Sequence, residues 1–318
     1  MNVLSLFDGC SGARLALARA DKEVDQYFTC EIDKYASMVT KLNFPNTTQL
    51  GDVTKVNFEM LPKIDFLVGG SPCQDLSFAK GNGKGLEGER SGLFYKYFEA
   101  LEVLRKKNPE IKFLFENVKM KQEWKDIISD KLGVQPIFIN SADFSAQNRQ
   151  RLYWTNITID SWSESNVKLK DILEDGQVDR DKSHCLDANY FKGGNLKSYF
   201  EKHRRQLVFN YIPVNKCIQV GEADVKGWDN IKRVYSPEGK SPTLASGHDR
   251  EPKVHVPPLK WRKLTPLECE RLQTVPDNYT KCGQKDDGEI VLISNTQRYK
   301  MLGNGFTINV IAHILKNL

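Results

Sequence analysis

A cysteine directly behind a proline is the first feature of this sequence that could do chemistry. The apolar run of residues 65–70 ends in two glycines, and Ser71 and Pro72 then lead to Cys73. A second apolar run, residues 111–118, carries Glu116 close to its end. If both runs are parallel strands, their carboxyl ends meet at one edge of a sheet. A thiolate nucleophile and a carboxylic acid would then lie side by side in a crevice.

Three further motifs follow strand-like runs and favour a nucleoside-bearing cofactor. Gly9 and Gly12 allow a tight backbone turn with a helix behind it. Glu31 lies about 20 residues further on, where an acid suits the two hydroxyls of a ribose. Asp52 could accept a hydrogen bond from an adenine amino group. The dinucleotide GxGxxG spacing is absent, which disfavours a nicotinamide oxidoreductase, and simple turns and helix caps remain the alternative interpretation.

These residues need a scaffold, and the first half of the chain supplies an alternating one. Helical patterns separate short apolar runs that are typical of strands buried on both faces. The alternation predicts an α/β fold, with a doubly wound, mostly parallel sheet and helices on both faces. Strands are expected at 2–8, 26–31, 65–70, 111–118, 135–144 and 151–157, and helices at 12–20, 34–42, 92–107 and 122–132.

The alternation stops near residue 158 and gives way to a stretch rich in Gly, Pro, Asn and Lys. Periodicity resumes at Thr265, which forms a capping box with Glu268, and the chain closes with a helix over 305–318. We therefore expect two domains. Residues 1–158 and 262–318 form a catalytic and cofactor-binding domain, and residues 159–261 form a smaller, loop-rich domain with short β-strands.

Composition and charge narrow the class of protein. The chain has 318 residues, is 40% hydrophobic, and has no apolar run near the roughly 20 residues that span a bilayer. Its seven cysteines are odd in number and form no CxxC pair, which favours free thiols in a reduced compartment and no metal site. Residues 180–260 contain 15 Lys/Arg against 9 Asp/Glu, with interleaved aromatics. This pattern suits a polyanion, although a solvated surface over core aromatics would look alike.

The chain resembles the DNA cytosine-5 methyltransferases of bacteria and phages through eight motifs in the family's order. Single motifs are weak, but the ordered set is specific, and it covers residues 1–158 and 262–318. "SPCQDLS" is especially similar to the de novo animal enzymes. Phe306 departs from the family, which usually has Val there, whereas Asn304 is in place. The motifs are "FDGCSG", "EID", "GDV", "SPCQ", "ENV", "QNRQR", "RKLTPLECERLQTVPDNY" and "GNGF".

The resemblance implies methyl transfer from S-adenosylmethionine to C5 of a cytosine flipped out of double-stranded DNA at a specific short sequence. Cys73 would add to C6 of the base and Glu116 would donate to N3. Arg149 and Arg151 would orient the cytosine and its phosphate. Glycine-rich residues 79–92 would close over the DNA as a lid.

The resemblance also implies the binding residues. Residues 159–261 would be the target-recognition domain, and Arg204 and Arg205 are expected to point opposite ways on a β-like stretch. Expected DNA contacts are Gln147, Arg204, Arg205, Arg233 and Arg250. Expected cofactor contacts are Phe7, Asp8, Gly9, Cys10, Gly12, Glu31, Ile32, Asp52, Val53, Pro72, Leu93, Asn304 and Phe306.

Two alternatives stay open at this point. A tRNA cytosine-5 methyltransferase would use the same framework, although the separate basic module favours DNA. A catalytically silent, methyltransferase-like DNA-binding protein would not need Cys73, Glu116 and both arginines. We expect a cytoplasmic monomer of prokaryotic or phage origin, with no secretory leader and no membrane contact. A cognate restriction endonuclease would be a functional partner rather than a physical one.

Overall fold

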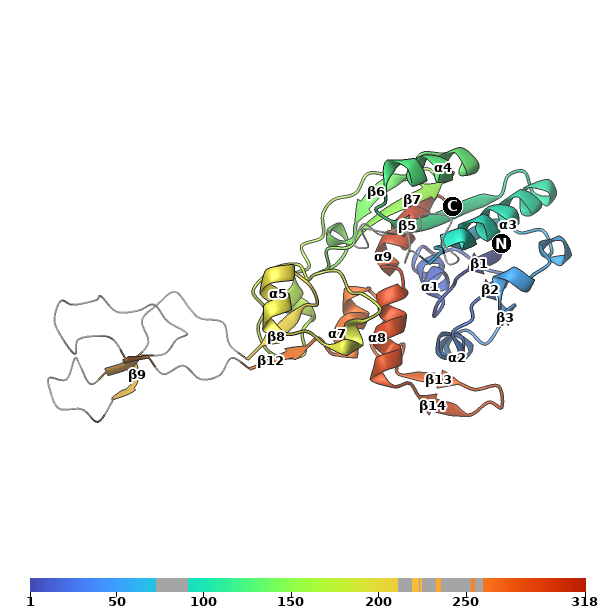
Figure 1. The fold of residues 1–318 in the computed structure, drawn as a ribbon. Helices are drawn as coiled ribbons and strands as arrows, with labels where there is room; N and C mark the ends of the chain where they lie inside the picture. Colours follow the sequence, from blue (N-terminus) through green and yellow to red (C-terminus); the bar gives the residue numbers. More distant parts are fainter. Residues whose placement is uncertain (73–90, 211–218, 223, 225–232, 236–252, 255–259) are drawn as a thin grey trace.

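A seven-stranded sheet forms the centre of the molecule (Figure 1). The computed structural model describes residues 1–72, 91–210, 219–222, 224, 233–235, 253–254 and 260–318. The strand order is β3-β2-β1-β4-β5-β7-β6, and within this sheet β7 alone runs antiparallel to its neighbours. The strands are β1 (Asn2–Leu6), β2 (Gln26–Cys30), β3 (Thr47–Gln49), β4 (Phe66–Gly69), β5 (Lys112–Val118), β6 (Ile137–Asn140) and β7 (Gln150–Thr155).

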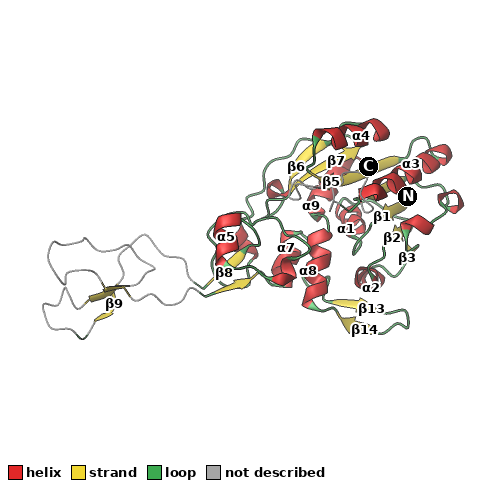
Figure 2. Cartoon of the chain, in the orientation of Figure 1, coloured by secondary structure: helices red, strands yellow, loops and turns green. Residues whose placement is uncertain are grey.

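Helices cover both faces of this sheet (Figure 2). Successive strand residues point to opposite faces. In β4, Phe66 and Val68 accordingly belong to one buried cluster, while Leu67 belongs to another. The first cluster is completed by α1 (Gly12–Arg19), α2 (Lys34–Asn43) and α9 (Ile308–Ile314), and the second by α3 (Phe94–Lys107) and α4 (Gln122–Leu132). The predicted doubly wound, mostly parallel sheet is confirmed.

Three elements differ from the sequence prediction. The three-residue strand β3 was not expected, because its Thr-Thr-Gln sequence has no apolar run; it pairs with β2 at the sheet edge. The third helix begins at Phe94 rather than at residue 92, after a 3₁₀ turn over Ser91–Leu93. The closing helix begins at Ile308, and a separate helix that the pattern missed, α8 (Asn295–Asn304), precedes it.

Beyond β7, short elements pack around a second group of helices. These are α5 (Leu196–Lys202) and β8 (Leu207–Phe209), followed by β12 (Trp261–Lys263), which pairs with β8, and α7 (Pro266–Leu272). The predicted capping box of α7 is confirmed: the Glu268 amide donates to the Thr265 hydroxyl, and the Thr265 amide donates to the Glu268 carboxylate. The remaining strands are β9 (Gln219–Glu222), β10 (Arg233–Tyr235), β11 (Lys253–Val254), β13 (Cys282–Gln284) and β14 (Ile290–Leu292).

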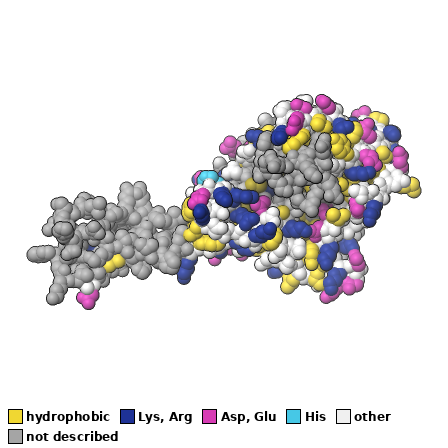
Figure 3. Space-filling view, in the orientation of Figure 1, with side chains coloured by type: hydrophobic (Ala, Val, Ile, Leu, Met, Phe, Trp, Pro, Cys, Tyr) yellow, Lys and Arg dark blue, Asp and Glu magenta, His cyan; other side chains and the backbone are white. Residues whose placement is uncertain are grey.

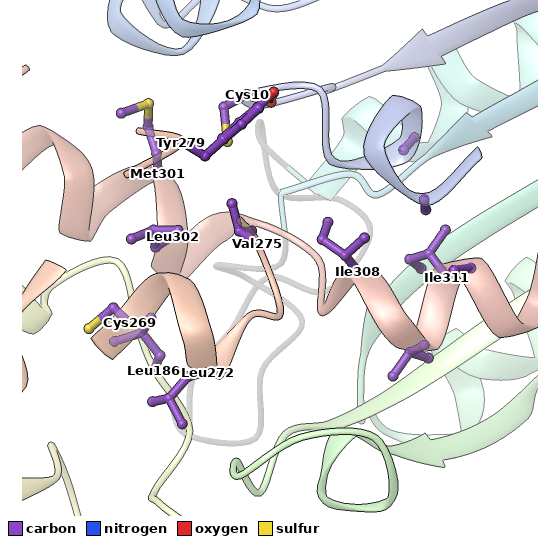
Figure 4. Packing of buried hydrophobic residues seen from close by; sticks show 14 of the residues in the cluster. Cys10, Leu186, Cys269, Leu272, Val275, Tyr279, Met301, Leu302, Ile308 and Ile311 are labelled. Carbon is purple, nitrogen blue, oxygen red and sulfur yellow. The ribbon is translucent and has the colours of Figure 1, made fainter. Parts of the chain in front are cut away.

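One buried cluster joins α7, α8 and α9 to the turn after β1 (Figure 4). The Tyr279 hydroxyl donates to the Cys10 carbonyl at 2.7 Å. Leu186 and Tyr190, from the segment assigned to the smaller domain, belong to the same cluster. The domain boundaries at 159 and 261 therefore stay a prediction. In the part of the chain that the structure describes, no helix is both long and apolar enough to cross a membrane.

A buried ion pair between α7 and α8 generates a stability prediction. Glu270 is 0% exposed, and its carboxylate accepts from Arg298 Nη2 at 3.0 Å and from the Thr280 amide at 2.8 Å. Arg298→Met leaves this buried carboxylate without its cation, so the free energy of unfolding should fall by about 3 kcal/mol in urea titrations. The matched variant Arg271→Met breaks a more exposed pair with Asp277 and should cost about 1 kcal/mol or less. Equal losses would contradict the assignment.

Candidate active site

A cavity of about 710 Å³ opens at the carboxyl ends of the central strands. β1 is flanked by β2 and β4, so the chain winds away from β1 in both directions and leaves a crevice there. The volume suits a nucleoside-sized ligand. All the expected cofactor contacts line it: Phe7, Asp8, Gly9, Cys10, Gly12, Glu31, Ile32, Asp52, Val53, Pro72, Leu93, Asn304 and Phe306.

Asp8 positions the turn between β1 and α1. Its carboxylate accepts from the hydroxyls of Ser5 at 2.5 Å, Ser11 at 2.8 Å and Tyr27 at 2.8 Å. Burial raises the pKa of this carboxyl, and the three hydroxyl donors partly offset that cost. Phe7 and Ser11 have φ angles of 58° and 61°, a region that side chains other than glycine rarely adopt. The Asp8 hydrogen bonds therefore stabilise a backbone conformation that the turn sequence alone would not favour.

Glu31 connects the end of β2 to the same turn. One carboxylate oxygen accepts from the Gly9 amide at 2.8 Å, and the other accepts from the amides of Ile32 at 2.8 Å and Asp33 at 2.7 Å. Burial raises the pKa of this carboxyl, whereas the backbone donors lower it. Three of the roughly four lone-pair sites of this carboxylate are thus occupied, and Oε2 keeps one for a ligand hydroxyl such as that of a ribose.

The outer rim of the cavity combines apolar and acidic groups. Ile32 lines the cavity and is 80% exposed, so its side chain is available to contact a ligand. Asp52 accepts from the amide and the hydroxyl of Thr54, and these bonds lower the pKa of its carboxyl. Lys300 Nζ lies 2.7 Å from Asp33 Oδ2 at the cavity wall. Among the described residues, no three His, Cys, Asp or Glu side chains group closely enough to hold a metal ion.

Glu116 and Arg151 form an ion pair at the inner side of the cavity. They lie on the adjacent antiparallel strands β5 and β7, and Arg151 Nε is 2.7 Å from Glu116 Oε1. Both side chains are largely buried, at 13% and 14% exposure, so the pair is shielded from solvent. A carboxyl group held this way can exchange a proton or a hydrogen bond with a ligand that enters the cavity.

The predicted nucleophile follows directly from this region but lies outside the described residues. Ser71 and Pro72 leave the end of β4, and Asn117 Nδ2 donates to the Ser71 hydroxyl at 3.2 Å. Pro72 lines the cavity, and Cys73 is the next residue in the chain. Residues 79–90 of the expected lid are also outside the described part.

Two described cysteines border the cavity without suiting nucleophilic chemistry. Burial raises the pKa of the Cys10 thiol and of the Cys30 thiol to about 12 each. The thiolate is the reactive form of cysteine, and it is scarce at neutral pH for both residues. Neither side chain therefore competes with Cys73 for the nucleophile assignment.

Arg149 and Gln147 lie deeper than their predicted roles require. Arg149 lines the cavity but is 4% exposed, and its guanidinium donates to the carbonyls of Leu186 at 3.0 Å and Gly305 at 2.9 Å. Gln147, an expected DNA contact, is 0% exposed. Its amide is engaged by internal partners, including the Leu186 amide, so it presents no surface to DNA in this structure.

The expected DNA-contacting arginines occupy different surroundings. Arg204 and Arg205 lie in the turn between α5 and β8, not on an extended stretch, because His203 ends α5 in the left-handed region and Arg205 has a φ of 57°. Arg204 is exposed, whereas Arg205 Nη1 donates to the Gly193 carbonyl at 2.6 Å. Arg233 is exposed on β10, and Arg250 lies outside the described residues.

Several cavity residues escaped the sequence analysis. Gln273 and Val275 reach the cavity from the end of α7, and Met301 and Leu302 reach it from α8. Their signal is weak, because they are polar or apolar residues beside helix ends with no spacing of their own. Gln273 and Val275 lie within the motif "RKLTPLECERLQTVPDNY", which was the available signal, whereas Met301 and Leu302 stand just before "GNGF" and belong to no quoted motif.

The sheet and its cavity together define a class of protein. A mostly parallel seven-stranded sheet with one antiparallel strand next to the edge, and a ligand crevice beside β1, is the fold of the S-adenosylmethionine-dependent methyltransferases. The methyltransferase EhMeth of Entamoeba histolytica has a similar structure, with a TM-score of 0.62 at 16% identity, over 100% of this chain and 97% of that one. A putative DNA modification methyltransferase from an E. coli prophage gives 0.54 at 20% identity, over 100% and 98%.

Sequence comparisons identify the family within this class. The C-5 cytosine-specific DNA methylase family matches residues 1–318. The type II methyltransferase M.HhaI of Haemophilus parahaemolyticus is 29% identical over 347 residues, which cover 100% of this chain and 94% of the relative. M1.ScrFI of Lactococcus lactis subsp. cremoris is also 29% identical, over 99% of this chain and 77% of the relative. The chain belongs to the C-5 cytosine-specific DNA methylases and is a DNA (cytosine-5)-methyltransferase.

The close approach of Gly70 to Glu116 generates a prediction for activity. A Cβ atom at Gly70 would lie 2.8 Å from Glu116 Oε2 and 3.2 Å from the Glu116 carbonyl. Gly70→Ala should therefore displace the carboxylate and lower methyl transfer to DNA by about 100-fold, because small misplacements of a reacting group are costly. Transfer of a labelled methyl group measures the effect. Full activity in Gly70→Ala would show that the carboxylate position is unimportant.

Proposed function

We propose that this protein methylates C5 of a cytosine that is flipped out of double-stranded DNA at a specific short sequence, through a covalent bond between Cys73 and C6 of the base. The observation that carries this proposal is the Glu116–Arg151 pair, which opens onto the same cavity as Glu31, with Pro72 at its wall. The Glu116 carboxyl group, the residue that precedes Cys73 and a nucleoside-sized crevice thus lie together, as a cytosine methyltransferase requires.

The described residues fit S-adenosylmethionine. The crevice is nucleoside-sized, and Glu31 Oε2 keeps acceptor capacity for a ribose hydroxyl. Ile32 and Leu93 would cover the adenine, and Asp52 would accept from its amino group. When bound, the cofactor supplies a methyl group activated by a positive sulfonium. Asp8 would act indirectly, by holding the Gly9 turn in its conformation.

The chemistry follows from the weak nucleophilicity of cytosine C5. Addition of the Cys73 thiolate to C6 makes C5 enamine-like, while Glu116 donates a proton to N3. After C5 has taken the methyl group, a base removes the C5 proton, which restores the double bond and expels the thiolate, and N3 returns its proton to Glu116. Arg151 would keep Glu116 oriented toward the base through the 2.7 Å contact. Base flipping is needed because C6 is inaccessible to a thiol inside a stacked duplex.

We assign most DNA contacts to residues 159–261, with residues 1–158 and 262–318 as the catalytic part. Figure 3 shows Lys and Arg side chains gathered around α5 and α7. Such a cluster can neutralise phosphates without reading bases. Exposed cations in this region are Lys192, Lys197, Lys202, Arg204 and Lys260.

Bacterial type II methyltransferases and phage orphan methyltransferases are among the relatives, and this supports a proposal for the cellular setting. We infer a monomer that acts in the cytoplasm of a bacterium or of a phage-infected cell. A restriction endonuclease, where one exists, would share the target sequence rather than bind this protein.

A mechanism-based inhibitor that stays covalently bound to the enzyme tests whether Cys73 is the nucleophile. A duplex with 5-fluorocytosine at the target position cannot lose its C5 substituent, so the wild type should form a covalent complex that resists denaturing electrophoresis. Cys73→Ala should form none and transfer no methyl group, yet bind cofactor normally. Trapping through another cysteine would refute the role of Cys73.

Labelled cofactor with transfer RNA in place of DNA distinguishes the RNA-modifying alternative, and a wild type without turnover on either nucleic acid would indicate a silent binding protein.

Arg204 and Arg205 offer a matched pair for testing DNA contact. Arg204 is exposed, whereas the Arg205 guanidinium is engaged with the Gly193 carbonyl. Arg204→Gln should reduce the slope of log affinity against log salt by about 0.9, the value for one lost phosphate contact. Arg205→Gln should leave the slope unchanged and lower thermal stability instead. A slope that changes only in Arg205→Gln would reverse the assignment.

A further inference from the structure

Two buried glutamines form an amide pair that the proposed reaction leaves unexplained. Gln147 precedes β7, and Gln273 ends α7; both are 0% exposed. Gln147 Nε2 donates to Gln273 Oε1 at 3.1 Å. Buried side-chain amides are costly unless their hydrogen bonds are satisfied, so a pair of them needs specific partners on each side.

On one side, Gln273 holds the turn between α8 and α9. Its Nε2 donates to the carbonyls of Leu302 at 2.6 Å and Gly305 at 3.3 Å, and its backbone carbonyl accepts from the Ile308 amide at 2.9 Å. Thr307 Oγ1 donates to Gln273 Oε1 at 2.9 Å. This turn carries two of the expected cofactor contacts and forms a wall of the cavity.

On the other side, Gln147 holds residues 183–187. Its Oε1 accepts from the Leu186 amide at 2.8 Å. The Ser183 amide donates to the Ala146 carbonyl at 2.8 Å, and the Asn148 amide donates to the Ser183 carbonyl at 3.0 Å, so the main chains also pair around Gln147. Residues 183–187 lie in the segment to which we assign DNA recognition.

The two sides also touch directly. A Cβ atom at Gly303 would lie 2.3 Å from the backbone carbon of Asp187, so only glycine allows α8 to approach the 183–187 segment this closely. Arg149 bridges the same two segments, donating to the Leu186 and Gly305 carbonyls. The cavity wall and the recognition segment therefore share one buried hydrogen-bond network.

We propose that the Gln147–Gln273 pair couples cofactor binding to DNA recognition, with Gln273 as a positioning residue for the cofactor and Gln147 as the link to residues 183–187. The proposal rests on the proposed function for its two ligands. When cofactor binding shifts the 302–305 turn, the carbonyls that accept from Gln273 move. Gln273 then moves relative to Gln147, and the hydrogen bond from the Leu186 amide to Gln147 changes with it. Because coupling between two binding sites is reciprocal, DNA must then tighten cofactor binding by the same factor that cofactor tightens DNA binding.

The experiment measures two affinities for each variant. Cofactor affinity is measured by calorimetry without DNA, and affinity for a duplex containing the target is measured with and without S-adenosylhomocysteine. Gln273→Met and Gln147→Met keep side-chain length but remove the amide. Gln284→Met, on the distant β13–β14 hairpin, is the matched control.

Gln273→Met should weaken the cofactor by about tenfold, since buried carbonyls lose their donor, and should raise KM for the cofactor with little change in kcat. In Gln147→Met, the affinity for cofactor in the absence of DNA should stay within about threefold of the wild-type value. The factor by which cofactor strengthens DNA binding should be mostly lost in this variant. The double variant should show no further loss of this factor. The control should resemble wild type throughout.

Specific outcomes overturn the proposal. A wild type whose DNA affinity is independent of cofactor, or a Gln147→Met variant that keeps the full factor, would refute the coupling. If the Met variants fail to fold by circular dichroism, Gln147→Glu decides, because it retains the acceptor for the Leu186 amide and loses the donor to Gln273 Oε1 and to the Leu272 carbonyl; unchanged coupling there overturns the proposal. A wild type that binds no cofactor would instead refute the proposed function, which keeps the two failures distinct.

Discussion

The site depends on the register of four parallel strands. Cys30, Leu6, Gly69 and Phe115 lie side by side across β2, β1, β4 and β5. The residues that follow them, Glu31, Phe7, Gly70 and Glu116, therefore lie in one row; the first three leave the sheet there, whereas Glu116 stays in β5, paired with β7. A slip of one residue in any of these pairings would send the following side chain to the other face of the sheet. The register of the parallel strands thus places Glu31, on the cofactor side of the cavity, and Glu116, on the catalytic side, at the same edge of the sheet.

This row is packed tightly enough to require glycine at its centre. A Cβ atom at Gly69 would lie 2.6 Å from the Leu6 carbonyl, and one at Gly70 would lie 2.8 Å from Glu116 Oε2. The two glycines let the end of β4 pass close to both neighbours. The Phe306 ring lies beside both Gly70 and Gly12. A Cβ atom would be 3.4 Å from the ring at Gly70 and 3.6 Å from it at Gly12. Phe306 therefore packs beside both loops.

Sequence reasoning succeeded where function follows directly from a buried strand. Apolar runs located six of the seven sheet strands, and the residues at the carboxyl ends of β1, β2 and β4 lie in the cavity because these three strands are parallel. It failed where a side chain is committed to a distant segment. Nothing in the local sequence shows that Gln147 faces Gln273, or that Arg149 reaches Leu186 and Gly305, because such contacts arise only from tertiary packing. The turn at Arg204 was missed for a similar reason, since His203 ends α5 without the usual glycine.

The walls of the cavity come from parts of the chain that are made at very different times. Phe7 to Gly12 emerge early from a ribosome, whereas Ile308, whose Cδ1 is 3.3 Å from where a Gly12 Cβ would be, emerges after the whole sheet. The apolar side of α1 packs against α9, so this helix also stays uncovered until the end of the chain arrives. Ligand binding then has to wait until α8 and α9 dock, so a partly synthesised chain cannot bind the cofactor in a closed pocket or modify DNA. The order of synthesis itself keeps an unfinished enzyme silent.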